Sequence, residues 1–327
     1  MQGAPGMKVL AAWLLALSLV TAGFFVTVAV LNSMVYGPGH EVGEYLDALR
    51  SGNGERALGQ LNASVPEGNA AVLDGGPLQR AASAVQDVEV QDPEPAGEDL
   101  VNVPVRYTIG DTDYTTSFPL RKTESEWLFF DTWEFVPSTL PTVGVSVGTM
   151  SESTVNGLRI ATPEGRNILP TFYPVELVAQ YTSEYFAAPP RTLPVTSTTP
   201  ANTTIPLEPA PTPALVDAVD GEIRTFLDSC AAQAVFQPAG CPFNFQTSQR
   251  RAGDIRWSIQ RYPEVRIEPT DGGWAPAPLN GTARLDTQLQ DLFSGSIEDV
   301  SAPQDFEFTA NLTVTDSSVI VRPMIEF

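Results

Sequence analysis

The feature that most constrains this chain is an uncharged apolar run near its N-terminus, from Val9 to Leu31. At about 1.5 Å of rise per residue, a helix of this length slightly exceeds a hydrocarbon core of roughly 30 Å. A helix also satisfies its own backbone hydrogen bonds, as a bilayer demands. The hydroxyls of its polar members can bond back to helix carbonyls: Ser18, Thr21 and Thr27. We therefore expect residues 9–31 to form a transmembrane helix.

Two other interpretations of this run are less favoured. A cleaved signal peptide has an apolar core of roughly 7–15 residues and a small-residue cleavage site. This run is longer, and the following stretch, NSMVYGPGH, offers a poor cleavage site. A buried core helix of this length at a chain terminus is the second alternative. The pattern favours a retained anchor over both.

Flanking charge predicts the orientation of the anchor. Lys8 and the N-terminal amine precede the run, whereas Glu41 and Glu44 follow it. Positive charge stays cytoplasmic, so we expect residues 1–8 to form a cytoplasmic stub and the rest to lie outside the cell membrane. The sequence thus predicts a single-pass protein of the cell envelope with a large extracytoplasmic region.

The charge balance excludes one class of partner. The 327 residues carry a formal net charge of -21, and the only lysines are Lys8 and Lys122. A nucleic-acid binder needs a basic face that displaces counterions, so we expect no nucleic-acid partner. An acidic surface is also repelled by anionic lipid headgroups, so we expect most of the chain to lie away from the bilayer surface. Two cysteines, Cys230 and Cys241, fit one local disulfide, which an extracytoplasmic location permits.

Beyond the anchor, the pattern predicts an α+β domain over residues 39–136. Helical spacing of Val42, Tyr45, Leu46 and Leu49 predicts a first helix, SGNG ends it, and a second helix follows through Leu61. The segments LVNVPVRYTIG and DYTTSFPLRK predict a hairpin around Gly110-Asp111, and EWLFFDTWEF predicts a further strand. Helices followed by an antiparallel meander indicate an α+β arrangement.

Two further domains are predicted. Residues 141–207 read as a small all-β domain with a turn at Asn156-Gly157, and the Pro- and Thr-rich stretch 194–214 as a linker with an edge strand at Thr203 to Leu207. Residues 213–327 predict a second α+β domain, with a helix followed by five strands. One face of that helix is expected to carry Leu215, Val219, Ile223, Phe226, Leu227, Cys230 and Val235.

These residues resemble known families. The phrases EYLDALRSGNGERALGQL and YTIGDTDYTTSFPLRKTESEWLFFDTW resemble the cone-shaped domains of the nuclear transport factor two-like superfamily on bacterial membrane anchors. That resemblance implies a sheet curled around helices, leaving a pocket. The order of strands, Val-Asn-Gly and Leu-Pro-x-x-Tyr-Pro resembles the teicoplanin-resistance-associated membrane protein family. The Gly-Cys-Pro-Phe arrangement is similar to the C-terminal part of actinobacterial anchored proteins, and this resemblance implies no function.

The chain departs from that family in two places. A Phe-Pro-Gly-x-Tyr segment is common there, whereas Leu169-Pro170-Thr171-Phe172-Tyr173 lacks the glycine. Relatives usually carry a cytoplasmic zinc ribbon before the anchor. Only residues 1–8 precede it here, without cysteine, so either that module is absent or the chosen start misses it.

Motifs of enzyme chemistry are missing from the sequence. The single histidine, His40, stands at the junction of anchor and first domain, where a solvated or helix-start role is expected rather than a catalytic triad. No zinc-type ligand set, Ser-x-x-Lys, G-x-S-x-G, Walker or dinucleotide motif occurs. The segment Gly110-Asp111-Thr112-Asp113 is interpreted as a hairpin turn rather than as a metal site. We expect no catalytic residue, no metal and no cofactor.

Aromatic side chains are the remaining candidates for ligand contact. Within residues 39–136 these are Tyr107, Tyr114, Trp127 and Trp133. Tryptophans such as these, with Trp257 and Trp274, could form a carbohydrate platform, although strand aromatics more often belong to a core.

Two hypotheses about function follow. The first is a non-catalytic envelope protein that binds a wall polymer, a peptide or a membrane protein through the cone pocket or a sheet edge. The second is an envelope hydrolase with a carboxylate site in the pocket, since 39 acidic residues are present. Buried, converging carboxylates in the pocket of residues 39–136 would favour the enzyme, and aromatic and aliphatic lining would favour binding.

Overall fold

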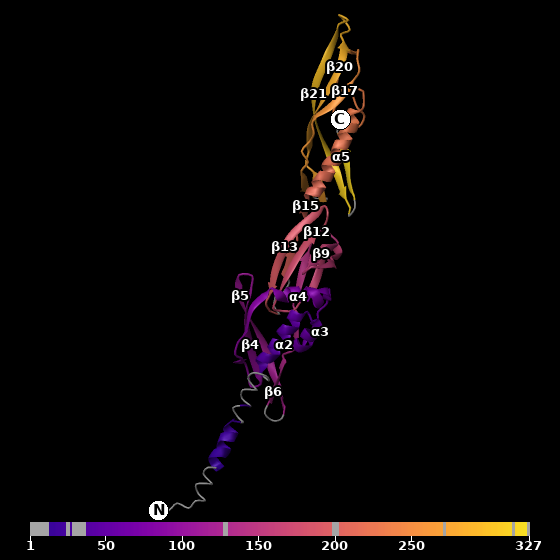
Figure 1. Ribbon diagram of the computed structural model, residues 1–327. Helices are drawn as coiled ribbons and strands as arrows, with labels where there is room; N and C mark the ends of the chain where they lie inside the picture. Colours follow the sequence, from indigo (N-terminus) through magenta and orange to yellow (C-terminus); the bar gives the residue numbers. More distant parts are fainter. Residues whose placement is uncertain are drawn as a thin grey trace, which may run out of the picture. The chain divides into compact units, whose positions relative to one another are not determined.

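The chain forms two compact units (Figure 1). The first comprises Met1–Tyr181 with Ala188–Glu208, and the second comprises Thr182–Ala187 with Pro209–Phe327. The computed structural model describes residues 13–23, 27, 37–126, 130–197, 203–270, 273–315 and 318–325, without the side chains of 124–126 and 130.

The N-terminal apolar run is described only in part. Residues 13–23 are helical, whereas 9–12, 24–26 and 28–31 lie outside the described residues. The predicted back-bonding of hydroxyls is confirmed: Ser18 donates to the Leu15 carbonyl (2.9 Å), Thr21 to Leu17 (3.0 Å) and Thr27 to Gly23 (2.9 Å). Among the helices that the structure describes, none combines the length and the apolar character needed to cross a membrane.

Helices open the first unit beyond the N-terminal run. They are α2 (Pro38–Ser51), α3 (Gly54–Leu61) and α4 (Gly75–Ser83), with the 3-10 turn η1 (Ala70–Val72) between the last two. The predicted apolar face of α2 is buried. Gly52 ends α2 with φ 71°, a conformation that a glycine adopts without strain. A Cβ there would lie 2.6 Å from the Gly75 carbonyl oxygen, so the helix ends where α4 begins to pack.

A twisted antiparallel sheet follows the helices. Its order is β2-β4-β5-β6, with the short β3 paired to β4. The strands are β2 (Val85–Val90), β3 (Glu94–Pro95), β4 (Leu100–Ile109), β5 (Thr112–Glu126) and β6 (Phe130–Phe135). Figure 1 shows α2 and α3 beside this sheet. The predicted hairpin is confirmed, because Ile109 faces Thr112 across a two-residue turn with Gly110 at φ 59°.

The rest of the first unit is strand and turn. The strands are β1 (Ala63–Ser64), β7 (Ser138–Thr139), β8 (Thr142–Ser146), β9 (Glu152–Val155), β10 (Leu158–Ala161), β11 (Arg166–Pro170), β12 (Val175–Thr182), β13 (Phe186–Val195) and β14 (Thr203–Pro206). The last residue of β12 and the first two residues of β13 belong to the second unit. The predicted turn at Asn156-Gly157 joins β9 to β10, with φ of 45° and 74°. The predicted edge strand is also confirmed, since β14 pairs in parallel with β8.

A cluster of buried aromatic side chains lies in the core of the first unit. Tyr45 of α2 meets the rings of Phe118 on β5, Phe135 on β6 and Phe172 edge-on, with centroids 5.6–6.4 Å apart. Tyr173 stacks on Phe118 at 5.6 Å. Residues 39–136 and the β-rich residues that follow them therefore share buried apolar surface within this unit.

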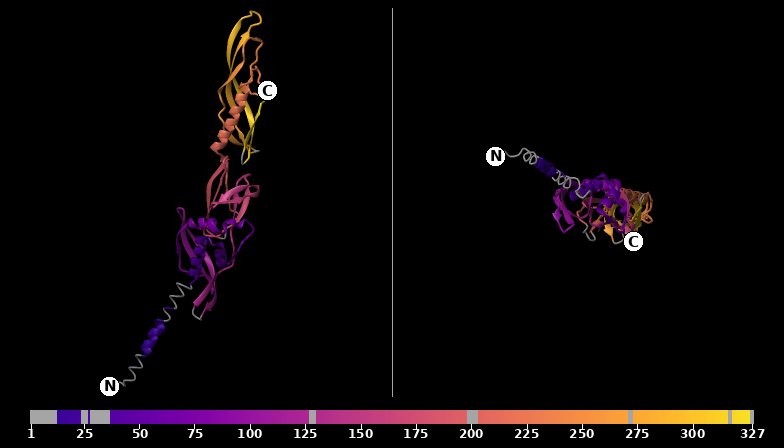
Figure 2. Two further views of the ribbon diagram at one scale, coloured as in Figure 1. Left: turned by 45° about the vertical axis from the view of Figure 1, so that its right-hand side comes forward. Right: turned by 90° about the horizontal axis from the view of Figure 1, so that it is seen from below.

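The second unit combines a helix with a long antiparallel meander. After β15 (Ala210–Pro211) come α5 (Pro213–Ala231), β16 (Arg250–Arg251), β17 (Arg256–Arg261), β18 (Ile267–Thr270), β19 (Gly273–Pro276), β20 (Leu279–Gln290), β21 (Ile297–Val314) and β22 (Val319–Met324). The sheet runs β16-β20-β21-β22, with β17 also on β20, and β18 pairs with β19. Figure 2 shows α5 lying along these strands.

The predicted face of α5 is confirmed except at its end. Leu215, Val219, Ile223, Leu227 and Cys230 are buried, and Phe226 is half-buried against Phe308. Val235 was expected on this face and is instead 47% exposed, because the helix ends at Ala231. The chain then turns through Gln233, whose side chain bonds the main chain of Ala239.

The fold class is mixed α and β, as the sequence predicts, although several elements were not predicted, among them α4, β2 and β19. The segment that forms α4, GGPLQRAAS, opens with two glycines and a proline and has only Leu78 as a large apolar residue. Its burial comes mainly from small side chains, Ala81 and Ala82, which carry little periodic signal.

Candidate functional site

The best candidate site is a pocket of about 400 Å³ in the first unit, where β6 ends and the chain departs toward β7. This volume falls within the range of roughly 300–1,000 Å³ that is typical of ligand sites. The described lining consists of hydroxyl-bearing and apolar side chains: Leu61, Thr115, Thr116, Ser117, Pro119, Phe135, Val136, Pro137, Ser138, Tyr173, Thr196 and Ser197.

One wall of the pocket is fixed by a relay of hydroxyls. The Thr116 hydroxyl donates to the Thr196 carbonyl at 2.5 Å and lies 2.6 Å from the Tyr107 hydroxyl. Because the threonine proton points to Thr196, the Tyr107 phenol is the donor in the second bond. Burial raises the pKa of Tyr107, so the phenol keeps this proton at physiological pH. The relay ties residue 196 to β5 and holds the pocket in shape.

A second part of the lining is built on Tyr173. Its ring is stacked on Phe118, and its carbonyl accepts a hydrogen bond from Tyr45 at 2.6 Å. Burial raises the pKa of the Tyr173 phenol, and the Ser138 hydroxyl opposes that rise. The Ser138 hydroxyl is buried and makes no hydrogen bond of normal geometry among the described residues. This part of the lining therefore presents neutral hydroxyl groups beside aromatic carbon.

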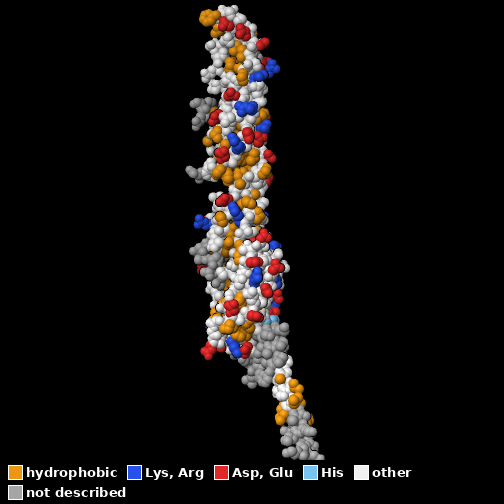
Figure 3. Space-filling model, turned by 90° about the vertical axis from the view of Figure 1, so that its left-hand side faces the viewer, with side chains coloured by type: hydrophobic (Ala, Val, Ile, Leu, Met, Phe, Trp, Pro, Cys, Tyr) orange, Lys and Arg blue, Asp and Glu red, His pale blue; other side chains and the backbone are white. Residues whose placement is uncertain are grey.

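The pocket is uncharged. None of its described lining residues is an Asp, Glu, Lys, Arg or His. The surrounding surface differs, because acidic side chains are scattered over the face shown in Figure 3. A neutral, hydroxyl-rich pocket suits hydrogen bonding to an uncharged group, and its described lining contains no carboxylate or imidazole.

A second, smaller pocket in the same unit does carry carboxylates. It measures about 340 Å³ and is lined by Glu41, Gly59, Gln60, Asn62, Trp133, Glu134 and Phe135. Glu134 is exposed and Glu41 is half-buried. Trp133 lines the same pocket as a half-buried side chain of β6. Glu41 and Glu134 are the two carboxylate residues that line this pocket.

The aromatic candidates from the sequence fall in different places. Tyr107 is fully buried and stacks on the half-buried Tyr114 at 6.0 Å, so it supports the relay rather than facing solvent. Trp133 lines the smaller pocket. Trp127 lies outside the described residues. The sequence did not nominate Thr115, Ser117 or Tyr173.

One signal in the sequence could have pointed to this wall of the pocket. Pro119 lies inside a strand. Because a proline has no N–H, it occurs in strands at positions where the neighbouring strand needs no hydrogen bond from it. Thr115 and Ser117 are spaced from Pro119 by even numbers, so their main-chain groups share its direction.

The remaining chemical candidates give no site. His40 is exposed in the first turn of α2, as the sequence predicts. Within the described ranges, no group of three or more His, Cys, Asp or Glu side chains is placed to hold a metal ion. A shallow pocket of the second unit has acidic lining from Asp254, Asp286 and Asp299. Asp286 accepts from Ser301 at 2.6 Å and Asp299 from Gln288 at 2.9 Å, so two of these carboxylates serve local structure.

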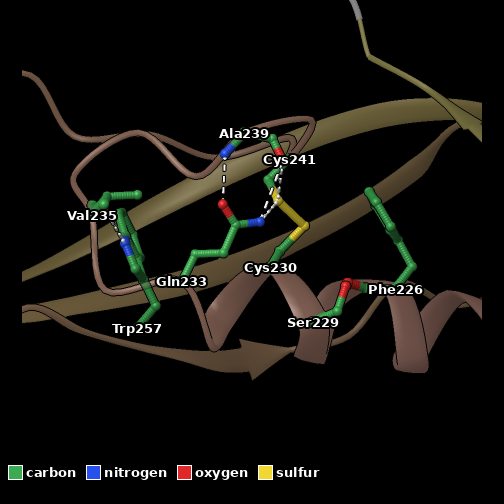
Figure 4. The surroundings of a disulfide bond; sticks show 8 residues. All are labelled: Phe226, Ser229, Cys230, Gln233, Val235, Ala239, Cys241 and Trp257. Atoms are coloured by element: carbon green, nitrogen blue, oxygen red, sulfur yellow. Dashed lines mark hydrogen bonds between the residues drawn. A yellow bond between two sulfur atoms is a disulfide. The ribbon is translucent and has the colours of Figure 1, made fainter.

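The predicted disulfide is present in the second unit. Cys230 at the end of α5 is bonded to Cys241, with Cα atoms 5.7 Å apart (Figure 4). Gln233 spans the same loop, accepting from the Ala239 N–H at 2.8 Å. Beside it, the Trp257 indole donates to the Val235 carbonyl at 2.8 Å. A disulfide of this kind fits an extracytoplasmic location.

Comparisons with known proteins give little further help. No protein-family model and no curated protein matches the chain. Among solved structures, the chain is similar to an "Ntf2 like protein involved in plasmid conjugation", with 10% identity over 86% of this chain and 92% of that one. The TM-score is 0.16, so we draw no argument from this similarity.

Proposed function

We propose that this chain is a non-catalytic, membrane-anchored protein of the cell envelope that binds a partner through the neutral pocket of its first unit. The observation that carries the proposal is the described lining of that pocket, which has hydroxyl, aromatic and aliphatic groups and no carboxylate. Such a site holds a ligand by hydrogen bonds and apolar contact without turning it over. A wall polymer, a peptide or another membrane protein is the expected partner class.

The anchor and the location belong to the same proposal. The apolar run 9–31 is the anchor, with residues 1–8 in the cytoplasm and the two units outside. The disulfide between Cys230 and Cys241 supports this location, because thiols in the cytosol are kept reduced. The resemblance to anchored cone-shaped domains is in accord with both parts.

The experiment is a capture from intact envelopes. Full-length tagged protein, crosslinked in its native membrane and purified, should retain a specific wall fragment or membrane protein, and mass spectrometry should find that partner chemically unmodified. Blocking the pocket with Thr196→Trp should abolish capture, whereas Glu307→Trp, at an exposed position of β21 in the second unit, should retain it. Capture that survives the blocked pocket would place binding elsewhere.

The alternative is an envelope hydrolase that uses Glu41 and Glu134 in the smaller pocket beside Trp133. Its specific support is the pairing of two carboxylates with an aromatic platform. Steady hydrolysis of a wall-derived substrate, abolished by Glu41→Gln or Glu134→Gln in a folded protein, would establish this alternative.

A further inference from the structure

The neutral pocket lies along an unpaired stretch of sheet edge. Strand β6 pairs with β5 only from Leu120 onward, where Leu120 faces Phe135. After Val136 the chain leaves the sheet toward β7. Among the described residues, no strand pairs with residues 112–119 of β5 on the side away from β4.

The direction of the main-chain groups on this edge follows from two prolines. The Pro104 carbonyl on β4 accepts from Gln91 at 2.9 Å, so it points away from β5. Pro104 faces Ser117, and a proline has no N–H to offer. Pro104 and Ser117 therefore form a non-hydrogen-bonded pair, and the N–H and C=O of Ser117 point outward from the β4–β5 ladder.

The alternation extends this result to two neighbours. Thr115, two residues before Ser117, has the same orientation because the ladder alternates with period two. Pro119, two residues after Ser117, confirms this orientation. Its carbonyl points away from β4 and accepts a hydrogen bond from the Val136 N–H at 3.0 Å, at the end of β6. Thr115 and Ser117 thus continue a ladder that β6 has left, and both also line the pocket.

We propose that the ligand of this pocket is an extended peptide that pairs with residues 113–117 of β5 and adds a strand where β6 stops. The inference rests on the proposed binding function and names its ligand class. The N–H and C=O groups of Thr115 and Ser117 point outward in the same direction, and the two residues are about 6.8 Å apart along the strand. This spacing equals the distance between successive hydrogen-bonding residues of an added β-strand. Strand addition to an open sheet edge is a recurring mode of peptide recognition.

The lining indicates which peptides fit. Every described side chain that lines the pocket is uncharged, and the one charged residue of the paired stretch, Asp113, forms an ion pair with Arg106. Burying a peptide carboxylate or ammonium here would lack a countercharge and would cost free energy. The occupant is therefore a segment rich in β-branched, hydroxyl-bearing or small apolar residues, whose main chain supplies the affinity and whose alternate side chains enter the pocket.

The test uses the full-length protein in detergent micelles and a defined probe. The probe is a fluorescent hexapeptide of alternating valine and threonine, acetylated and amidated at its ends. We expect saturable binding and new protection from hydrogen exchange at the Thr115 and Ser117 amides. A counterpart N-methylated at alternate residues keeps the side chains but loses main-chain donors, and it should bind at least about tenfold more weakly.

A matched pair of variants isolates the edge. Ser117→Pro removes the outward N–H without touching the β4 ladder, whereas Ser117→Ala keeps that N–H. Ser117→Pro should weaken probe binding about tenfold or more, and Ser117→Ala by less than about threefold. Thr115→Pro repeats the test at the other position, and thermal unfolding checks that each variant is folded.

The outcomes separate this inference from the function on which it rests. Absence of probe binding, or equal binding by Ser117→Pro and Ser117→Ala, overturns the peptide inference. Binding of an N-acetylglucosamine oligomer in the same pocket, unaffected by Ser117→Pro, would also overturn it while leaving the binding function intact. If neither probe binds and the envelope capture also yields no partner, the proposed function itself fails.

Discussion

The Tyr45 hydroxyl donates a 2.6 Å hydrogen bond to the main-chain carbonyl of Tyr173, which lies 128 residues further along the chain. The phenol is completely buried, and burial raises its pKa well above the ordinary value. This bond holds the aromatic wall of the pocket against α2. The wall is therefore positioned by a residue of the first helix rather than by its own strand.

Replacing Tyr45 tests this relationship. Tyr45→Phe keeps the ring packing but leaves the buried Tyr173 carbonyl without its donor. We expect a loss of about 1–3 kcal/mol in the free energy of unfolding of the first unit, measured by urea titration. Tyr181→Phe is the control, because Tyr181 is also buried and its hydroxyl makes no hydrogen bond within the described chain. Equal effects of both variants would contradict the role of the bond.

The hydrophobic pattern predicts helices and hairpins well where one face carries large side chains. Val42, Tyr45 and Leu49 mark α2, and the Gly110-Asp111 and Asn156-Gly157 turns fall where the sequence places them. These signals are local, since each depends on side-chain period or on residues that tolerate positive φ.

The candidate site could not be predicted in the same way. The pocket exists because β6 stops opposite Leu120 and the chain departs through Pro137, so that no described strand pairs with Thr115 and Ser117 on the side away from β4. The length of one strand relative to its neighbour is a tertiary property. Aromatic residues drew attention in the sequence, yet Tyr107 proves to be a buried support for the hydroxyl relay.

A second prediction concerns Asn156, which connects a turn to two other elements. Its side chain accepts from the Val178 N–H at 2.6 Å and donates to the Glu176 carbonyl at 3.0 Å, and its own carbonyl accepts from the Arg80 guanidinium. Asn156→Gly keeps the positive φ but removes the side-chain bonds, so we expect about 2 kcal/mol of destabilisation by urea titration.

Asn156→Ala should cost about 1 kcal/mol more than Asn156→Gly, because alanine is strained at φ 45°. Asn62 is the matched control, with φ 50° at the exposed end of α3. Asn62→Ala should show only the strain, and a loss as large as that of Asn156→Ala would refute the hydrogen-bond explanation.

The third prediction concerns the disulfide. Closing a loop between Cys230 and Cys241 stabilises the second unit by about 3 kcal/mol on the chain-entropy estimate. The double variant Cys230→Ala with Cys241→Ala should lower the unfolding free energy of the second unit by this amount and leave the first unit unchanged. Alkylation of native-source protein in denaturant without reductant should label neither cysteine. Two labelled thiols would show that the bond does not form in the cell.

The fourth prediction concerns the anchor. Protein extracted from membranes should retain its first residues in N-terminal sequencing, and a mature form that begins after Ser33 would show cleavage instead. Protease added outside wall-stripped cells should remove the mass beyond Tyr36, because the flanking charges predict that this part lies outside. Full protection of the C-terminal units, with lysed cells digested as the control, would reverse the orientation.

The last prediction concerns the tip of the β20–β21 hairpin, where Asp291 holds the turn. Its carboxylate accepts from the Ser294 N–H (2.7 Å), the Ser294 hydroxyl (3.0 Å) and the Phe293 N–H (2.9 Å). These bonds, the Ser294 N–H first, lower the pKa of Asp291. A lowered pKa stabilises the folded turn above the ordinary Asp value of about 3.9, and that stabilisation disappears as the pH falls through the lowered value.

We therefore expect the Ser294 amide to keep its NMR shift from pH 7 down to about 4, near the ordinary Asp pKa, and to change below it. Asp291→Ala should produce the acid form of the turn already at pH 7, since no carboxylate remains to accept. Phe293→Ser is the matched control, because the fully exposed Phe293 ring leaves only its main-chain N–H in the network. A Ser294 shift that follows pH identically in Asp291→Ala would show that another group controls the turn.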